Sequence, residues 1–348
     1  MKILALDLGK SKTVACHFDT DGGAHSFLSM ASRPSEIHDA IAEVAPDRVV
    51  FEVCTDAGWV ADICRALDVE FQAVNPSTLA RSYHRRRAKS DRQDALDLAK
   101  ASAMGSTNPI HVPDRATRSW RETIEQRCAA VERRTERYNQ IRAMMQSLSI
   151  PMAPCGKAWS AKGIAELRSL RATLESAHDR ARLEIHLDAL AAADIEVARL
   201  EKLLDAIASE RAEVALLQTV PGVGPRLAET VVAWIDDPRR FGNARQVGCY
   251  AGLTPRPDQS GDMDRTSRIS KAGPSRLRSM LVEVAWIMRR YNAWAREVYE
   301  RVLHGSKSRK KQAIAALARR LLVRLWAMLR DRTTWSPPEA KLAGTAST

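Results

Sequence analysis

Four carboxylates in the N-terminal third of the chain have the types and positions of ligands for a hard divalent cation. Asp7 and Glu52 each follow a short apolar run, so each lies at the end of a predicted strand. Asp91 and Asp94 stand three residues apart at the start of a predicted helix and share one helix face. Carboxylate oxygens suit Mg²⁺ or Mn²⁺, and two such ions about 4 Å apart stabilise the attacking and leaving oxygens of a phosphodiester. One such acid alone would more often be a helix cap, but the set predicts metal-dependent phosphodiester cleavage.

The segments that carry these acids alternate between strand and helix patterns. Buried strands are predicted at 3–6, 49–51 and 71–74, and a hairpin strand at 13–18, before the polar turn 19–23. Helical periodicity covers 35–44 and 58–67. This alternation predicts an α/β sheet. Sites in such sheets gather outside the carboxyl ends of strands, where Asp7 and Glu52 would lie.

The middle of the chain is predicted to be helical. Asp114 is positioned to cap a helix that runs towards Ile150, and a second helical region begins near Ile164. Two heptad positions of this region are largely apolar: Leu183, Leu190, Val197 and Leu204 occupy one, and His186, Ala193, Leu200, Ile207 and Val214 the other. The pattern predicts a coiled coil, paired either within one chain as an antiparallel hairpin or between chains.

A glycine-containing turn in the C-terminal half is a candidate phosphate-binding element. Residues 219–228 resemble the hairpin of a helix-hairpin-helix module, in which Gly222 and Gly224 permit a tight turn. The helix that follows would present backbone N–H groups to a DNA phosphate without sequence preference. An ordinary connection between two helices fits the same residues equally well.

The stretch 254–278 is the second chemical candidate. Ser260 precedes Gly261 in a predicted loop rich in Pro, Asp and Gly. Serine is a poor nucleophile without a base or a positive field, and no His or Asp is positioned by sequence as its base. Nearby cations would stabilise charge on an attacked phosphate: Arg256, Arg265, Arg268, Lys271, Arg276 and Arg278. From the residues alone a solvated loop serine remains the more common situation.

Charge favours a polyanionic partner. The net charge is +12 and the isoelectric point is near 9.7. Residues 81–92 hold six Lys or Arg and one Asp, and residues 301–330 hold nine and no acid. The first cluster adjoins the acids at 91 and 94 and includes Arg85, Arg86, Arg87 and Lys89. These cations would either hold phosphates beside the acids or simply offset the repulsion between the carboxylates.

The remaining composition excludes several classes. None of the six cysteines forms a Cys-x-x-Cys pair, which argues against structural zinc, and reduced thiols suit a cytoplasmic protein. No signal peptide or membrane span is expected, because no apolar stretch reaches about 18 residues. We predict four parts: 1–112 with the acids, the helical segment 113–215, a domain at 216–332 that ends in two helices over 276–329, and a flexible tail at 333–348.

Two sets of motifs resemble one family. The four acids match the Asp-Glu-Asp-Asp signature of the Piv-like DNA invertases and insertion-sequence transposases, the insertion sequence 110 family, with Thr55, 74–76 and 89–95 as matching flanks. The family's C-terminal motifs follow in order at 220–225, 241, 250–255, 259–261, 269–273 and 276–278. The resemblance covers about residues 1–330. The chain departs from the pattern at Gln259, where many relatives have Ser, and at Asp262 and Asp264, where basic residues are common.

The resemblance implies more than the residues do. It implies a ribonuclease-H-like N-terminal domain similar to the RuvC Holliday-junction resolvase, with the metal at the four acids. It implies that Ser260 attacks a DNA phosphate and forms a phosphoserine link. It also implies a guide made from the element's own non-coding RNA, which pairs with donor and target DNA. A dimer or tetramer is implied too, and on that ground we favour pairing of the heptads between chains.

Two other functions fit part of the pattern. A metal-dependent junction resolvase or nuclease that uses water as its nucleophile needs the four acids but not Ser260. A non-catalytic nucleic-acid-binding protein needs neither, and it is disfavoured because the acids and the serine are all present.

Overall fold

Contacts along the chain divide it into two units, Met1–Arg118 and Ser119–Thr348. The structure, a computed structural model, describes residues 1–75, 90–260 and 263–336, with the backbone alone at 155–156, 256–260 and 263–267. The first unit corresponds to the predicted N-terminal part, with its boundary six residues later than expected. The second unit contains both the helical segment and the C-terminal part.

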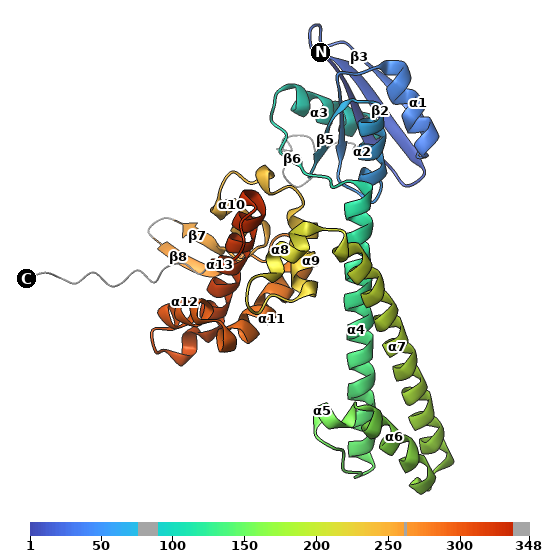
Figure 1. Cartoon of the computed structure of the whole chain (residues 1–348). Helices are drawn as coiled ribbons and strands as arrows, with labels where there is room; N and C mark the ends of the chain where they lie inside the picture. The colour runs from blue at the N-terminus through green and yellow to red at the C-terminus, as the bar shows by residue number, and fades with distance from the viewer. Residues whose placement is uncertain (76–89, 261–262, 337–348) are drawn as a thin grey trace, which may run out of the picture. The chain divides into compact units, whose positions relative to one another are not determined.

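The first unit is a mixed six-stranded sheet with helices (Figure 1). Its elements are β1 (Lys2–Leu8), β2 (Lys12–Asp19), β3 (His25–Ala31), α1 (Pro34–Val44), β4 (Arg48–Glu52), α2 (Ala57–Ala66), β5 (Glu70–Val74), α3 (Asp91–Ala103) and β6 (Pro109–Ile110). The strand order is β3-β2-β1-β4-β5-β6. β1, β2 and β3 pair antiparallel, β1, β4 and β5 pair parallel, and β6 pairs antiparallel with β5. The predicted mixture of strands and helices is confirmed.

Helices cover both faces of this sheet. Ile3, Ala5 and Val50 pack with apolar residues of α3. The alternate residues, Leu4 and Phe51 among them, pack with α1 and α2 on the other face. Burial on both faces explains why these strands are continuous apolar runs in the sequence. β3 was not predicted because it is an edge strand with mostly exposed or half-buried side chains.

The second unit begins with a long helical hairpin. Its elements are α4 (Arg115–Ser147), α5 (Cys155–Ala158), α6 (Ala161–Ser169), the 3₁₀ helix η1 (Leu170–Thr173) and α7 (Ala177–Ser209). The predicted cap is confirmed, because the Thr117 backbone N–H donates to Asp114 Oδ1 at 2.7 Å. α4 and α7 run antiparallel (Figure 1). Three ion pairs join them in reverse order along the two helices: Arg127 with Glu201, Arg133 with Glu196, and Arg134 with Asp194.

The heptad seam of α7 lies inside this hairpin. Leu183, Leu190, Val197 and Leu204 are all buried within one chain, and the first two pack with Ile141 and other apolar residues. The favoured pairing of this seam between chains is therefore corrected to the intrachain alternative. The physical reason is the break after α4, which lets the chain return and cover its own apolar stripe.

The C-terminal part of the second unit is mostly helical. Its elements are α8 (Ala212–Gln218), α9 (Pro225–Ile235), η2 (Pro238–Arg240), α10 (Ala244–Tyr250), β7 (Pro255–Ser260), β8 (Met263–Ile269), α11 (Ser275–Tyr291), α12 (Ala293–Leu303), η3 (Lys307–Arg309) and α13 (Lys310–Asp331). α13 runs through the core, where Leu317, Leu321 and Leu325 are fully buried. Trp120 and Ile124 of α4 join the same core, so the hairpin and the helical domain share apolar residues.

Two predictions for this region are wrong. The predicted loop around Ser260 is the antiparallel hairpin β7–β8. Pro255 and Pro257 argued against strands, but both strands of a two-stranded ribbon are edges, where proline is tolerated. The predicted pair of C-terminal helices is three helices, because Asn292 starts α12 by accepting a hydrogen bond from the Ala295 backbone N–H at 3.2 Å.

Two tryptophans of this region differ in exposure, and part of the predicted tail is packed. Trp326 is buried, whereas Trp286 is 38% exposed. Trp335, within the predicted tail, lies edge-on to Trp294 with the ring centroids 5.4 Å apart, and its backbone N–H donates to Thr219 Oγ1 at 3.0 Å. The rest of the tail, 337–348, lies outside the described residues.

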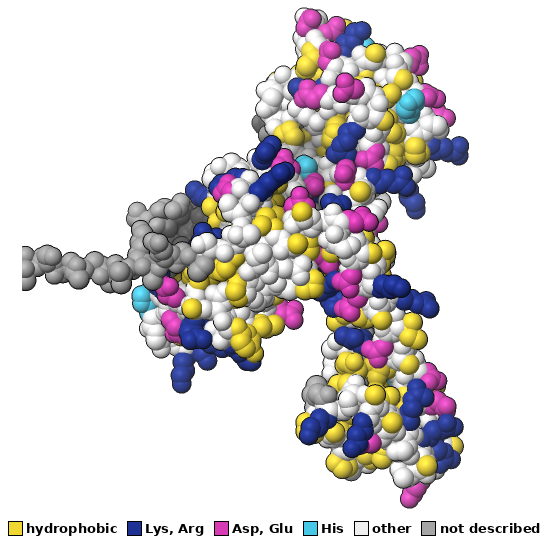
Figure 2. Space-filling view, viewed as in Figure 1, with side chains coloured by type: hydrophobic (Ala, Val, Ile, Leu, Met, Phe, Trp, Pro, Cys, Tyr) yellow, Lys and Arg dark blue, Asp and Glu magenta, His cyan; other side chains and the backbone are white. Residues whose placement is uncertain are grey.

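The surface carries both signs of charge. Figure 2 shows Lys and Arg side chains interspersed with Asp and Glu on the visible face of each unit, with no continuous basic sheet there. None of the helices in the described residues combines the length and apolar character needed to cross a membrane.

The buried seam yields a stability prediction. Leu190→Ala should lower the free energy of unfolding by about 2–5 kcal/mol, because it leaves a cavity between α4 and α7. The matched control is Leu203→Ala on the same helix, whose side chain is 50% exposed and should cost less than about 1 kcal/mol. Urea unfolding followed by circular dichroism measures both. Equal effects would show that the seam is not buried within the chain.

Candidate active site

The ends of β1 and β4 place two of the predicted acids on neighbouring strands. The parallel register pairs Leu6 with Phe51, so Asp7 and Glu52 follow side by side on strands about 4.8 Å apart. Side chains alternate along a strand. Asp7 therefore projects to the same face as Ala5, and Glu52 to the same face as Val50, which is the face that α3 covers. Both acids are half-buried.

The other two acids occupy the first turn of α3. Ser90 caps this helix by accepting a hydrogen bond from the Gln93 backbone N–H at 3.3 Å. Acids in a first turn are stabilised by the partial positive charge of a helix N-terminus, which favours Asp91 and Asp94 there. Ala95 and Ala99 are buried against the sheet and anchor the helix to it. The four acids thus belong to three elements packed on one face.

The donor chemistry of these acids fits a hard cation. All four are carboxylates, and carboxylates brought together repel unless a cation or protons intervene. In the part of the chain that is described, however, no three His, Cys, Asp or Glu side chains come close enough to hold a metal ion. Asp7, Glu52 and Asp94 each already take part in a hydrogen-bonding or electrostatic interaction. The predicted cations Arg85, Arg86, Arg87 and Lys89 lie outside the described residues.

Ser260 lies at the tip of the β7–β8 hairpin. It is the last residue of β7 and pairs with Met263, the first residue of β8. Gly261 lies outside the described residues, and for Arg256 and Arg265 only the backbone is described. A hairpin tip carries a residue away from the helical body, where a polymeric substrate can approach it.

The base of this hairpin is clamped by two backbone segments in direct contact. Gly252 and Gly273 both have left-handed backbone angles, with φ of 66° and 71°. A Cβ on Gly252 would overlap the Ala272 carbonyl, and one on Gly273 would overlap the Tyr250 carbonyl. The Lys271 backbone N–H donates to the Gly252 carbonyl at 3.1 Å. These contacts explain the two glycines at 252 and 273 and fix the direction of the hairpin.

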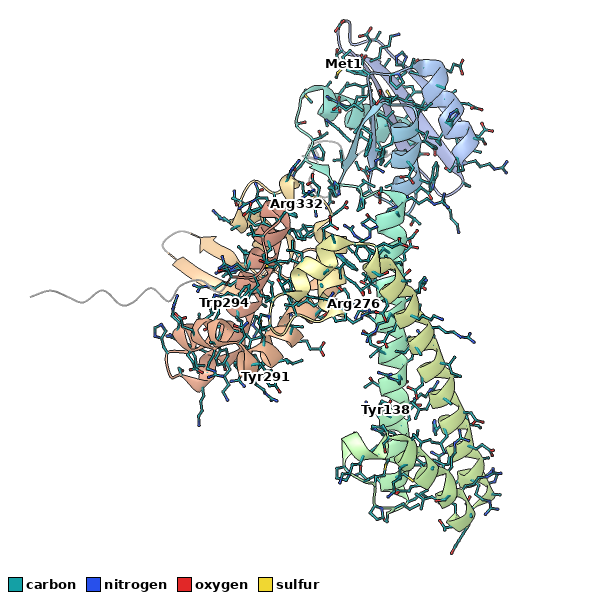
Figure 3. The ribbon with its side chains drawn as sticks, in the orientation of Figure 1. Met1, Tyr138, Arg276, Tyr291, Trp294 and Arg332 are labelled. Atoms are coloured by element: carbon teal, nitrogen blue, oxygen red, sulfur yellow. The ribbon has the colours of Figure 1, made fainter. Side chains whose placement is uncertain are left out.

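The predicted phosphate-binding cations near the hairpin have different surroundings. Arg268 and Lys271 are exposed at its base. Arg278 Nη1 donates to the Ala251 and Ala272 carbonyls, at 3.2 Å each. Arg276, labelled in Figure 3, donates to Glu125 and Glu132 of α4 at 2.9 Å each. The last two arginines therefore hold the domain together in this structure, and their contact with nucleic acid stays a prediction.

The turn between α8 and α9 is exposed and depends on glycine. Gly222 has φ of 98°, and a Cβ there would lie 3.1 Å from Met288 Cγ. Asn292 Nδ2 donates to the Pro221 carbonyl at 3.2 Å and holds the turn in place. Gly224 is the N-cap of α9 with open space around it. Gly222 is thus required by packing, while Gly224 leaves the start of α9 open to a ligand.

A buried acid on α9 was missed by sequence reasoning. Glu229 is fully buried, and its Oε1 lies 2.8 Å from Arg226 Nη2. Arg226 also binds Asp205 of α7, which ties α9 to the helical hairpin. Burial raises the pKa of Glu229 to about 7, Arg226 opposes the rise, and Asp205 adds to it. The i, i+3 spacing of Arg226 and Glu229 is the one local signal for this pair. The burial of Glu229 and the contact of Arg226 with Asp205 have no local signal, because they depend on packing against a distant segment.

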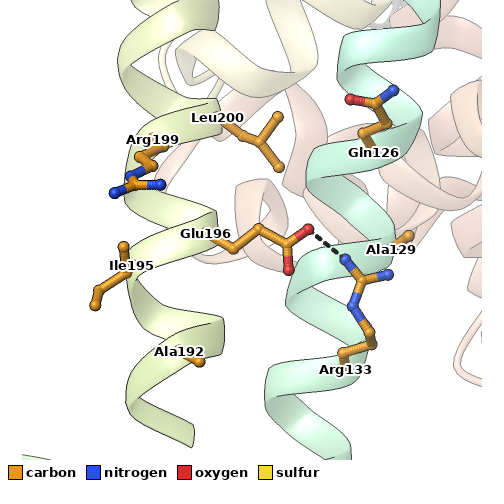
Figure 4. A pocket seen from close by; sticks show the side chains of 8 residues that line it. All are labelled: Gln126, Ala129, Arg133, Ala192, Ile195, Glu196, Arg199 and Leu200. Carbon is orange, nitrogen blue, oxygen red and sulfur yellow. Dashed lines mark hydrogen bonds and ion pairs between the residues drawn. The ribbon is translucent and has the colours of Figure 1, made fainter. Parts of the chain in front are cut away.

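A shallow hollow lies between α4 and α7 (Figure 4). Ala129, Ala192 and Ile195 contribute to its wall, and Arg133 and Glu196 bridge the two helices with an N–O distance of 2.6 Å. The hollow contains no predicted site residue. Arg133 and Glu196 neutralise each other. The hollow therefore does not resemble a catalytic site.

Comparisons with known proteins match both the N-terminal and the C-terminal part of the chain. The transposase family DEDD_Tnp_IS110 matches residues 4–150, and the Transposase IS116/IS110/IS902 family matches residues 214–300. The chain is 27% identical to a putative transposase, y4rJ, of Sinorhizobium fredii, over 93% of this chain and 90% of the relative. It is 25% identical to the transposase for insertion sequence element IS1111A of Coxiella burnetii, over 96% and 91%.

Two further similarities each cover about a third of this chain. A pilin gene-inverting protein of Moraxella lacunata is 37% identical over 119 residues, which is 33% of this chain and 36% of that protein. Among solved structures, Thermus thermophilus RuvC with a Holliday junction substrate is 15% identical with a TM-score of 0.24, and it covers 32% of this chain and 99% of RuvC. The protein is a transposase by these family matches. The chain belongs to the IS110 family of transposases.

The clamp at the hairpin base yields a second stability prediction. Gly273→Ala should lower the free energy of unfolding by more than about 2 kcal/mol, because a methyl group meets a backbone carbonyl and φ is unfavourable. Gly305→Ala is the matched control: φ is 70° there as well, but nothing lies within 4 Å of the new methyl. Its cost should be about 1 kcal/mol. Thermal unfolding compares them, and equal costs would contradict the clamp.

Glu229 yields a pH prediction. Its pKa is 4.5 when unperturbed and about 7 in the fold, so the unfolded chain loses this proton first as pH rises. The stabilising contribution of Glu229 is therefore full below pH 4.5 and declines until about pH 7. Glu229→Gln should remove this decline and gain on the order of 2 kcal/mol at pH 8. Exposed Glu213→Gln is the control. If urea unfolding shows the same decline in Glu229→Gln, another group causes it.

Proposed function

We propose that this transposase cleaves and rejoins DNA through a covalent bond between Ser260 and a DNA phosphate, with Asp7, Glu52, Asp91 and Asp94 holding Mg²⁺ or Mn²⁺. The observation that carries the proposal is the shared face of the first unit: Asp7 and Glu52 end adjacent parallel strands, on the side where α3 brings its two acids. The match of both halves to transposase families supports it.

The chemistry balances without water. The Ser260 oxygen attacks phosphorus, its proton is lost, and the displaced deoxyribose oxygen takes up a proton and leaves as a hydroxyl. Rejoining reverses this: a DNA hydroxyl attacks the phosphoserine and releases the serine. The divalent cation, when bound, supplies positive charge for the phosphate oxygens. Arg268 and Lys271, exposed at the hairpin base, would add to the positive field around the attacked phosphate.

Nucleic-acid binding would use several further contacts. The exposed turn at Gly222 and Gly224 would dock a DNA phosphate at the start of α9 without reading sequence. The nine cations in 301–330 would attract donor and target DNA. The proposal includes a guide RNA made from the element itself, which the family resemblance implies and which the same cations would bind. Cytoplasmic location follows from this role.

Self-association is part of the proposal, as a dimer or tetramer. The buried seam of α7 is not free to form it, but two isoleucines on α7 are exposed: Ile185 by 66% and Ile195 by 54%. Exposed apolar side chains along one long helix support an interface between copies. Such an assembly would allow half-sites from different chains to act on one DNA.

The mechanism is tested with end-labelled DNA on a denaturing gel. The wild type should give a protein-linked band that survives denaturation. Ser260→Ala should lose the band and recombination while it still binds DNA, because one hydroxyl contributes little to binding. Asp7→Asn and Asp91→Asn should reduce cleavage by at least about 100-fold, since each removes a charged ligand. Ser279→Ala, an exposed serine of α11, is the matched control and should behave as wild type.

The outcome also separates this mechanism from a nuclease that activates water. Such an enzyme would release free DNA ends, and its Ser260→Ala variant would still cut. Cleavage by that variant, without a covalent band in the wild type, would overturn the serine step. Normal cleavage by both aspartate variants would overturn the metal site.

A further inference from the structure

A groove of about 800 Å³ lies at the foot of the β7–β8 hairpin. Arg268 and Ser270 line it on the hairpin side. Gln312, Ala315, Ala316 and Arg319 of α13 line the opposite side. We call it the hairpin-foot groove. All of these residues lie in the second unit, and none of those on α13 was among the predicted site residues.

One face of α13 supplies the second wall. Positions 312, 315, 316 and 319 are spaced three and four residues apart, so their side chains lie along one side of the helix. The two alanines leave room in the centre of this wall. Gln312 and Arg319 provide hydrogen-bond donors at its two ends. The wall thus has a narrow apolar floor between two polar groups.

Arg319 is held in position by its stem. A Cβ added to Gly248 of α10 would lie 3.3 Å from both Cγ and Cδ of Arg319, so the aliphatic stem packs against that glycine. Neither the Arg319 nor the Gln312 side chain makes a hydrogen bond or ion pair with another of the described residues. A guanidinium with a fixed stem and unused donors is prepared for an external acceptor.

The lining selects an anionic ligand. Two arginines and an amide line the described part of the groove, and no acid does. Arginine donors match the oxygens of phosphate, and the apolar floor suits the sugar between two phosphates. An acidic protein segment would meet the same charge. Nucleic acid is favoured because Pro255, the first residue of the strand that ends at Ser260, lines the groove, and Arg319, one of the nine cations of 301–330, lines it as well.

The length of β7 sets the distance to the reacting serine. Pro255 lines the groove and Ser260 ends the same strand, which spans about 17 Å at about 3.3 Å per residue. Along the axis of a duplex a strand advances about 3.4 Å per nucleotide, so β7 spans about five nucleotides of a duplex whose axis runs parallel to it. We propose that the hairpin-foot groove binds the phosphodiester backbone about five nucleotides from the phosphate that Ser260 attacks, with Arg319 and Gln312 as its ligands. The register of five nucleotides rests on the proposed function, whereas binding in the groove does not.

The binding test uses Ser260→Ala protein, so that no DNA is cut. Adding Arg319→Ala should weaken binding to a labelled duplex about tenfold, and should reduce the slope of log affinity against log salt by about 1, for all DNA sequences. The matched control is Arg320→Ala, which removes the same charge from the next residue of α13, exposed and outside the groove. It should change affinity less than threefold.

A second variant keeps the charge and fills the groove. Ala316→Leu should also weaken binding, and an unchanged melting temperature would show that the domain remains folded. Equal effects of Arg319→Ala and Arg320→Ala, with normal binding by Ala316→Leu, would overturn the groove as a nucleic-acid site. A polyglutamate peptide provides a second such outcome. If binding of this peptide depends on Arg319 and binding of the duplex does not, the groove takes acidic protein segments and the proposal is overturned.

The result also separates this proposal from the proposed function. Wild-type DNA binding by Arg319→Ala, together with a Ser260 adduct, would remove the groove and leave the mechanism intact. An Arg319-dependent salt slope without any adduct would leave the groove as a nucleic-acid site and remove the serine mechanism. Ethylation interference then tests the register: it should show a phosphate about five nucleotides from the cut that loses its effect in Arg319→Ala.

Discussion

Parallel pairing between β1 and β4 determines the geometry of the candidate site in the N-terminal unit. Two strands that run in the same direction end at the same edge, so each delivers its last residue there. Their register sets Asp7 beside Glu52, and the alternation of side chains turns both to the face covered by α3. The chain between these two strands passes through β2, β3 and α1, and it contains none of the candidate acids. The pairing produces two neighbouring acids, on which the proposed cation site depends.

The hairpin that carries Ser260, the proposed nucleophile, depends on a different constraint, which is contact between backbones. Gly252 and Gly273 let the two segments flanking β7–β8 touch without side chains between them. The hairpin is thereby directed from a helical core that α13 fills. A flexible loop would hold Ser260 less precisely, and positioning is a large part of what an enzyme contributes to phosphoryl transfer. The groove beside the hairpin follows from the same arrangement.

The sequence predicts those features that depend on local burial. The strands ending at Asp7 and Glu52 are recognisable because both faces are covered, which requires apolar runs. The α7 heptad predicts a packed seam but not its partner, since α4 and a second copy would leave the same pattern. Arg226 and Glu229 have the i, i+3 spacing of a helical ion pair, but the sequence does not predict that Glu229 is buried or that Arg226 also binds Asp205 of another helix.

The candidate site residues likewise include some that the sequence predicts and some that it does not. The residue types at the acids and at Ser260 indicate the chemistry, whereas prolines at 255 and 257 concealed the hairpin. The groove residue Arg319 was invisible to sequence reasoning for another reason: what distinguishes it from Arg320 is which side of α13 faces the hairpin, and only tertiary packing decides that.

The central claim is that a serine rather than water attacks the phosphate. It can be tested by measuring whether oxygen from isotope-labelled water enters the phosphate. Cleavage and rejoining are carried out in ¹⁸O-enriched water, and the phosphates at the junctions are analysed by mass spectrometry. Attack by Ser260 followed by rejoining never introduces solvent oxygen, so the joined products should contain no ¹⁸O at those phosphates. One ¹⁸O at each newly formed phosphate end, with no phosphoserine peptide recovered, would contradict the account.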